Sequence, residues 1–237
     1  MNKILTIAKK EWRNYFSSPV GYVFAALLLI VCGWMFFGDL FLLGQANMGS
    51  YLTTMVFLFS IFIPAISMGL LADEKKNGNW EVILSMPIDE TKLVLGKLLG
   101  CGMYLLFTIA LSLPVAITMM LLGKPDVGII AGGYLGLIML GGAYLSVGLL
   151  ASSLSNQPMV GFLGATVFLI LDNMLGQEVV LARLPLFLKN IASALSLASR
   201  AGRFNEGLIT LNDVLFFVSW IAVFVILTVI SLKTRDK

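Results

Sequence analysis

The sequence predicts an all-α membrane protein that crosses the bilayer six times. Of its 237 residues, 59% are hydrophobic and only 12% are charged, whereas soluble domains carry about 25% charged residues. The apolar residues gather in long runs, and a helix of about 20 such residues spans the hydrocarbon core. These runs are continuous and do not alternate as the strands of a membrane barrel do. A single domain of six helices, covering residues 1–237, is therefore expected.

Residues 1–18 predict an amphipathic helix that lies on the membrane surface. Apolar residues recur there at helical spacing, and basic residues occupy the remaining surface. Helices of this kind bind anionic membrane surfaces. A cleaved signal peptide is not expected, because the apolar run that follows is too long and lacks a small-residue cleavage site. The residues expected to meet the lipid are Lys3, Lys9, Lys10, Trp12 and Arg13.

The six predicted spans cover residues 20–43, 52–71, 98–122, 128–154, 159–175 and 214–232. Pro64 and Pro114 lie inside spans and predict kinks, which membrane helices tolerate. Gly128, Gly132 and Gly136 recur at every fourth residue of the fourth span. Such a face of small residues predicts close packing of this span against another helix.

The distribution of basic residues predicts the orientation of the chain. An even number of spans puts both termini on one side, together with the loop between the second and third spans. Most of the 16 lysines and arginines lie on that side, which is therefore predicted to be cytoplasmic. The other side carries Lys124, Arg183, Lys189, Arg200 and Arg203.

Asp172 and Asn173 lie near the end of the fifth predicted span. An ionisable residue inside a span is by default a candidate for lining a polar pathway. Alternatively, the span ends about four residues earlier, and Asp172 lies at the outer interface. The chain has no histidine, and it shows no paired carboxylates and no nucleophile with a base. Neither a catalytic centre nor a metal or cofactor site is therefore predicted.

Residues 176–213 form a second non-spanning segment. Charges and Pro185 interrupt it too often for a straight span, yet it is too apolar for a free linker. We expect short re-entrant helices that dip into the outer leaflet or cap the bundle, and Asp213 is expected to cap the last span. The basic residues of the segment are interpreted as headgroup contacts. Our hypothesis is that the segment is an outer gate or a dock for an extracytoplasmic domain.

A polar island at residues 72–100 separates the second and third spans. Each of its charges would cost roughly 2.5–3.5 kcal/mol in hydrocarbon, so the island faces water. Within it, an apolar run that begins at Trp80 ends at Pro87. An apolar ridge stopped by proline suits docking against a soluble partner. An ordinary solvated loop is the alternative.

The island resembles the first cytoplasmic loop of ABC-2 type permeases, the membrane subunits of one class of ATP-binding-cassette transporters. The resemblance rests on Glu74, Gly78-Asn79-Trp80-Glu81, Ser85-Met86-Pro87 and Gly96-Lys97, with Asn79 where the family usually has threonine. The opening at residues 10–19 is similar to the family's N-terminal motif. The resemblance implies that residues 73–97 are a coupling loop. The residues expected to contact the ATPase are Glu74, Gly78, Trp80, Glu81, Val82, Ile83, Leu84 and Pro87.

Membership would imply a permease subunit of an ATP-driven exporter in a bacterial cytoplasmic membrane, with both termini in the cytoplasm. The chain has no Gly-x-x-x-x-Gly-Lys-Ser/Thr motif, so a partner ATPase dimer would bind ATP and Mg. The resemblance also implies a second permease, either another copy or a sister subunit with an extracytoplasmic domain. Membrane lipid is a further expected partner, and nucleic acid is not.

Residues 18–24 and 203–217 resemble the gliding-motility (GldF-like) and copper-enzyme-maturation (NosY-like) branch of this family. Two other functions stay open. One is a secondary transporter or channel, which would need coupling-ion sites near the midplane. The other is a membrane anchor that transmits ATPase-driven motion to an extracytoplasmic partner without transport.

Overall fold

The structure is a computed structural model that describes residues 3–43, 48–78, 89–122, 126–177, 180, 185, 189, 194–205 and 207–235. The elements found in these ranges are helices, which confirms the predicted fold class. They are α1 (Lys3–Ser17), α2 (Pro19–Leu43), α3 (Met48–Ser67), α4 (Gly69–Lys76), α6 (Glu90–Ala110), α7 (Leu113–Leu122), α8 (Val127–Leu154), α9 (Pro158–Gly176), α12 (Leu197–Asn205) and α13 (Leu211–Arg235).

The described residues contain 6 stretches long and apolar enough to cross a membrane. They are α2, α3 with α4, α6 with α7, α8, α9 and α13, in agreement with the six predicted spans. Several limits differ by a few residues; among them, the second stretch continues to Lys76 and the third begins at Glu90. The added turns carry charges that end a hydropathy run without ending a helix.

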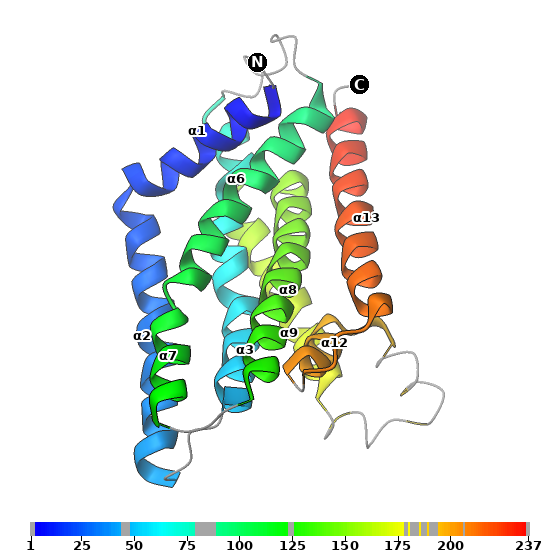
Figure 1. Cartoon of the computed structure of the whole chain (residues 1–237). Coiled ribbons are helices and arrows are strands. Elements are labelled where there is room, and N and C mark those ends of the chain that lie inside the picture. The colour runs from blue at the N-terminus through cyan, green and yellow to red at the C-terminus, as the bar shows by residue number, and fades with distance from the viewer. Residues whose placement is uncertain are drawn as a thin grey trace.

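The helices form a bundle with two distinct ends (Figure 1). The start of α1, the end of α4, the start of α6 and the end of α13 lie together at one end, here called the N/C face. The short helix α12 lies at the opposite end, here called the α12 face. The first and last described residues and both ends of the polar island therefore share one side, as an even number of spans requires.

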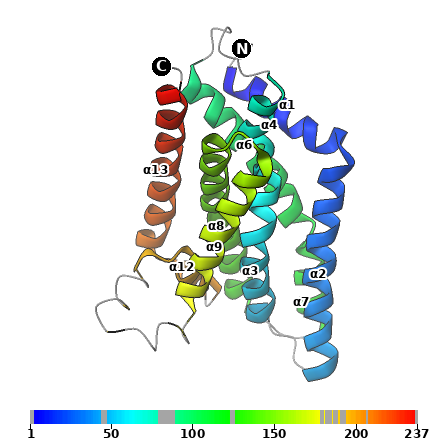
Figure 2. The same cartoon turned by 180° about the vertical axis from the view of Figure 1, so that it is seen from behind.

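Helix α8 occupies the centre of the bundle (Figure 2). It contacts α3, α6, α9, α12 and α13, and most of its side chains are buried. By contrast, α2, α9 and α13 expose large apolar side chains, as helices that face lipid do.

The glycines of α8 set the close approach of α12. A Cβ added at Gly132 would lie 2.8 Å from the backbone oxygen of Phe204, and one at Gly136 would lie 2.7 Å from the Phe204 Cβ. Gly128 differs, because its amide donates to the Asp126 carboxylate that caps α8 (2.8 Å). Two of the three predicted packing glycines thus contact α12, whereas Gly128 belongs to the start of α8.

The third span is broken between α6 and α7, two residues before Pro114. The Ser112 hydroxyl donates to the Ile109 carbonyl (2.7 Å), and the Tyr134 hydroxyl donates to the Ser112 carbonyl (3.2 Å). These bonds satisfy polar groups that the break frees inside the bundle. Pro64 has a milder effect, because α3 continues past it to Ser67 and α4 follows from Gly69.

We predict that Gly132→Ala destabilises the protein in detergent by roughly 1–3 kcal/mol, the usual cost of overpacking a tight site. The control is Gly164→Ala on α9, where an added Cβ meets nothing within 4 Å. This control should be neutral or stabilising, because alanine favours a helix. The readout is unfolding of the purified chain, and equal effects of the two variants would contradict the described contact between α8 and α12.

Candidate functional site

Helix α1 lies against α6 at the N/C face (Figure 1). Gly96 and Gly100 make this approach possible, since added Cβ atoms would lie 2.7 Å from the Ile7 Cβ and 2.6 Å from the Glu11 Cβ. Trp12, expected at the membrane surface, packs its ring edge-on to Phe107 with 6.0 Å between centroids. One side of α1 therefore contacts protein, while the predicted surface residues Lys3, Lys9, Lys10 and Arg13 are exposed.

A buried lysine joins three elements beneath α1. Lys97 on α6 is 2% exposed, and its Nζ lies 2.9 Å from the Glu11 Oε1 and 2.7 Å from the Glu74 Oε1. Glu11 belongs to α1, and Glu74 belongs to the last turns of α4. Such burial is tolerated only when the charge is paired and hydrogen-bonded. We call Glu11, Lys97 and Glu74 the charged triad.

The charged triad has one more carboxylate than it has cations. Its formal charge is −1, and the Glu74 Oε2 is buried without a hydrogen-bond partner among the described residues. The resemblance to the coupling loop includes Glu74 and the Gly96-Lys97 pair, whereas Glu11 belongs to the N-terminal motif with no predicted site role. A signal for Glu11 was present, because it is a carboxylate on the same helical face as Ala8 and Tyr15, in the apolar stripe of an amphipathic helix.

Tyr15 reinforces the same junction. Its hydroxyl donates to the Ile66 carbonyl (2.7 Å) and lies 3.3 Å from the Cys101 Sγ. Its ring stacks on Tyr104, whose hydroxyl donates to the Gly21 carbonyl (2.5 Å). Burial raises the pKa of the Tyr15 phenol well above its usual range, so the hydroxyl remains a donor at physiological pH.

Helix α4, at the N-terminal end of the polar island, is fixed to the C-terminal end of α8. The Leu71 and Ala72 amides both donate to the Ser152 hydroxyl oxygen (3.0 Å each), and this hydroxyl donates to the Met68 carbonyl (2.7 Å). The Lys75 ammonium donates to the Ser153 carbonyl. Helix α4 is thus held by side chains of a second span as well as by its own chain.

The described residues of the island are its two ends. Gly78 follows α4 with φ of +70°, a left-handed conformation that favours glycine and ends the helix. Asp89 begins α6, and its side chain accepts from the Thr91 amide (3.3 Å). Of the predicted ATPase contacts, only Glu74 and Gly78 lie within the described part. Trp80, Glu81, Val82, Ile83, Leu84 and Pro87 lie outside the described residues.

At the α12 face, Asp172 caps a helix. Its carboxylate accepts from the amides of Leu197 (3.0 Å) and Ala198 (3.2 Å), at the start of α12. Asn173 donates to the Tyr144 hydroxyl (2.9 Å). Helix α9 continues past both residues to Gly176. The described contacts give Asp172 an anchoring role between α9 and α12.

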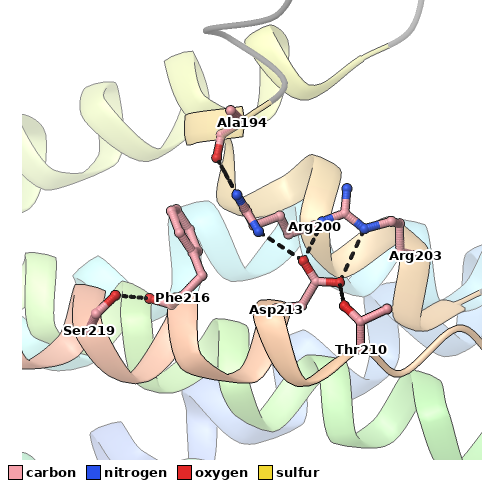
Figure 3. A network of polar contacts seen from close by, with 7 residues as sticks. All are labelled: Ala194, Arg200, Arg203, Thr210, Asp213, Phe216 and Ser219. Atoms are coloured by element: carbon pink, nitrogen blue, oxygen red, sulfur yellow. Dashed lines mark hydrogen bonds and ion pairs between the residues drawn. The ribbon is translucent and has the colours of Figure 1, made fainter.

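A second carboxylate fixes α12 to the last span (Figure 3). Asp213 is 1% exposed, and it pairs with Arg200 (2.9 Å) and with Arg203. The Thr210 hydroxyl donates to it (2.5 Å), and the Arg200 guanidinium lies 3.8 Å from the centroid of the Phe216 ring. We call Asp213, Arg200 and Arg203 the arginine clamp.

The arginine clamp adds to one expectation and corrects another. The guanidinium groups of Arg200 and Arg203, interpreted from the sequence as headgroup contacts, bind a protein carboxylate, because Asp213 is buried and needs cations nearby. Asp213 was expected to cap the last span. Helix α13 begins at Leu211, so Thr210 precedes it and Asp213 lies in its first turn.

Comparison with known proteins identifies the family of the chain. The family model described as ABC-2 family transporter protein matches residues 5–237. The chain belongs to the ABC-2 transporter family. No curated protein gives a significant match.

Membership makes the chain a permease subunit of an ABC transporter, a class that works with an ABC ATPase. In this ABC-2 permease, the charged triad lies at the base of the loop that resembles the family's coupling loop. Among the described residues, no group of three or more histidine, cysteine, aspartate or glutamate side chains could hold a metal ion. The charged groups of the site form ion pairs between helices.

We predict that Lys97→Met destabilises the ABC-2 permease by roughly 3 kcal/mol, because it leaves two buried carboxylates without their cation. Lys92→Met is the matched control, since Lys92 is an exposed lysine on the same helix. Denaturant unfolding of the purified variants in detergent measures the difference. Equal midpoints for the two variants would show that the charged triad is not a stabilising contact.

We predict that Asp213→Asn loosens α12 from α13 by about 3 kcal/mol, or roughly a hundredfold in the opening equilibrium. Hydrogen exchange of the amides of residues 197–205 measures this opening. Asn212→Ala changes the exposed neighbouring residue and should leave the exchange rates unchanged. If Asp213→Asn also leaves them unchanged, the arginine clamp does not hold α12.

Proposed function

We propose that this chain is the permease subunit of an ATP-driven ABC-2 exporter, and that residues 73–90 receive its ATPase. The charged triad carries this proposal. It joins α1, α4 and α6 at the base of the polar island, so a force on the island acts on three elements together. The bonds from α4 to Ser152 extend the same connection to α8.

The proposed contact combines an apolar ridge with charges. Trp80, Val82, Ile83 and Leu84 supply the apolar side chains, and Glu81 supplies a carboxylate for basic groups on the partner. Glu74 has its role inside the permease, where one of its oxygens binds Lys97 (2.7 Å). In this proposal Glu74 transmits the motion of the loop and does not itself bind the ATPase.

The ATPase is proposed to be a separate dimer that binds the ATP and Mg, because the chain has no phosphate-binding loop motif. The complete pathway is proposed to need a second permease, either a copy of this chain or a sister subunit with an extracytoplasmic domain. The apolar side chains exposed on α2, α9 and α13 offer surfaces for that partner and for lipid.

We further propose a bacterial cytoplasmic membrane as the location, with the N/C face in the cytoplasm. This orientation follows from the excess of lysine and arginine on that face. We also propose the gliding-motility (GldF-like) and NosY-like branch, supported by the resemblance over residues 18–24 and 203–217. On the opposite side, α12 and the arginine clamp are proposed to close the outer end of the pathway.

The test is Trp80→Ala in the permease coexpressed with the ABC ATPase of the same source. Truncating an aromatic anchor of an interface weakens binding by roughly 2 kcal/mol or more. Copurification of the ATPase should therefore fall, and so should the dependence of its hydrolysis rate on the permease. Both quantities are measured on the detergent-solubilised complex.

Trp34→Ala is the matched control. Trp34 on α2 is 80% exposed and lies outside the island, so its loss should leave ATPase association unchanged. If Trp80→Ala, Glu81→Ala and their double variant all retain normal copurification and normal hydrolysis, the island is an ordinary solvated loop. A wild-type chain that moves substrate along an ion gradient without any ATPase would instead support a secondary transporter.

A further inference from the structure

A groove opens at the N/C face beside the charged triad. It has a volume of about 680 Å³ and lies between α1, the start of α2 and the joint of α3 with α4. The groove exists because the chain turns at Ser18, after which α2 packs mainly on α3. Its volume is in the range of small-molecule sites, roughly 300–1,000 Å³.

The lining of the groove is amphipathic. Lys10, Asn14 and Ser18 are four residues apart and present one polar face of α1, opposite Asp73 and Glu74 of α4. The remaining wall is apolar and includes Val20, Phe24, Ile66, Met68 and Leu70. A ligand that matches this lining has a charged head and an apolar tail.

The apolar wall continues onto the outer surface of α2. Val20 lines the groove and is 56% exposed, and Val23 and Leu27 are exposed at the following helical positions. In a membrane these side chains face lipid. An acyl chain could therefore leave the groove along α2 without crossing a polar barrier.

The polar end carries an excess of negative charge. The charged triad contributes a formal charge of −1 to the groove, and the charges of Asp73 and Lys10 cancel each other. Neither Lys10 nor Asp73 has a side-chain partner among the described contacts. The Glu74 Oε2 is buried and lacks a donor within the described part of the chain. Buried carboxylate oxygens usually accept a hydrogen bond, so this end of the groove carries a carboxylate that no described residue neutralises in full.

A primary ammonium group complements this end of the groove. It carries positive charge and three N–H groups, so it can donate to the exposed Asp73 carboxylate, and its charge offsets the net charge of the charged triad. A neighbouring phosphate can bind the Lys10 ammonium, and the Asn14 and Ser18 side chains are further donors. A quaternary ammonium has the same charge but no N–H group, and it would leave the Asp73 carboxylate without a hydrogen bond.

We propose that the groove binds a phospholipid whose headgroup carries a primary ammonium, with the ammonium at Asp73 and the phosphate at Lys10. The acyl chain follows Phe24 and the exposed side of α2. This site adjoins the proposed ATPase contact at Asp73, but lipid binding needs no ATPase. Its failure would therefore leave the proposed function untouched.

Native mass spectrometry of the full chain in detergent tests the proposal. The probes are dioleoyl phosphatidylethanolamine, dioleoyl phosphatidylcholine and dioleoyl phosphatidylglycerol, which share their acyl chains and differ only in the headgroup. A charge-assisted hydrogen bond is worth about a factor of ten in affinity, so the ethanolamine lipid should be retained as a single adduct about tenfold more than the other two. Equal retention of the three lipids overturns the proposal, and preferential retention of the glycerol lipid shows an anion site instead.

Charge variants locate the adduct. Asp73→Asn should reduce retention of the ethanolamine lipid about tenfold, whereas Glu90→Gln, at the start of α6 and outside the groove, should not. Lys10→Gln should weaken binding, and Lys9→Gln on the same helix should not. Equal retention within each pair would place the lipid elsewhere and refute the site.

A volume variant leaves the charges intact. Ala65 lines the groove, and Ala65→Phe should fill the space and abolish the adduct while circular dichroism shows unchanged helix content. If Ala65→Phe is well folded and retains the lipid as the wild-type chain does, the groove is not the binding site.

Discussion

The N/C face depends on the burial of one lysine. Lys97 lies two turns inside α6, where an unpaired ammonium would be strongly disfavoured. Its two carboxylate partners come from the N-terminal helix and from the end of α4, so the lysine is stable only when α1, α4 and α6 are assembled. The close approach of α1 to Gly96 and Gly100 also stabilises the buried lysine, because it brings Glu11 next to Lys97. Helix α1 is therefore a structural part of the permease and not only a membrane anchor.

The two ends of the bundle use opposite charge arrangements. The charged triad has two carboxylates around one cation, whereas the arginine clamp has two cations around one carboxylate. In each case, the buried central residue belongs to a long helix, and its partners belong to short or peripheral segments. Apolar packing alone discriminates weakly between positions of a helix in a lipid environment. Ion pairs of defined geometry fix the position of α1 and α12 more specifically.

The sequence was sufficient for the spans but not for the contacts of charged side chains. Long apolar runs are a strong signal because lipid demands them, and all the predicted spans were found. The charges inside helical turns were harder to interpret. The contacts of Arg200 and Arg203 with Asp213, and of Asp172 with the start of α12, were not predicted, because hydropathy does not show which distant residue lies opposite. Glu11 was visible on the apolar face of α1, but its partner lies 86 positions away in the chain.

The third span is interrupted, whereas the neighbouring α8 is continuous, so the two should respond differently to a displacement at the N/C face. The third span is interrupted at Ser112, between α6 and α7. If α6 moves at the N/C face, this span can bend at Ser112, and α7 need not move with it. Helix α8 is continuous from Val127 to Leu154, a rod of about 42 Å at 1.5 Å per residue. One end of this rod holds α4 through Ser152, and the other receives α12 at Gly132 and Gly136. If α8 tilts about its middle, a movement of its Ser152 end in one direction would therefore shift α12 in the opposite direction.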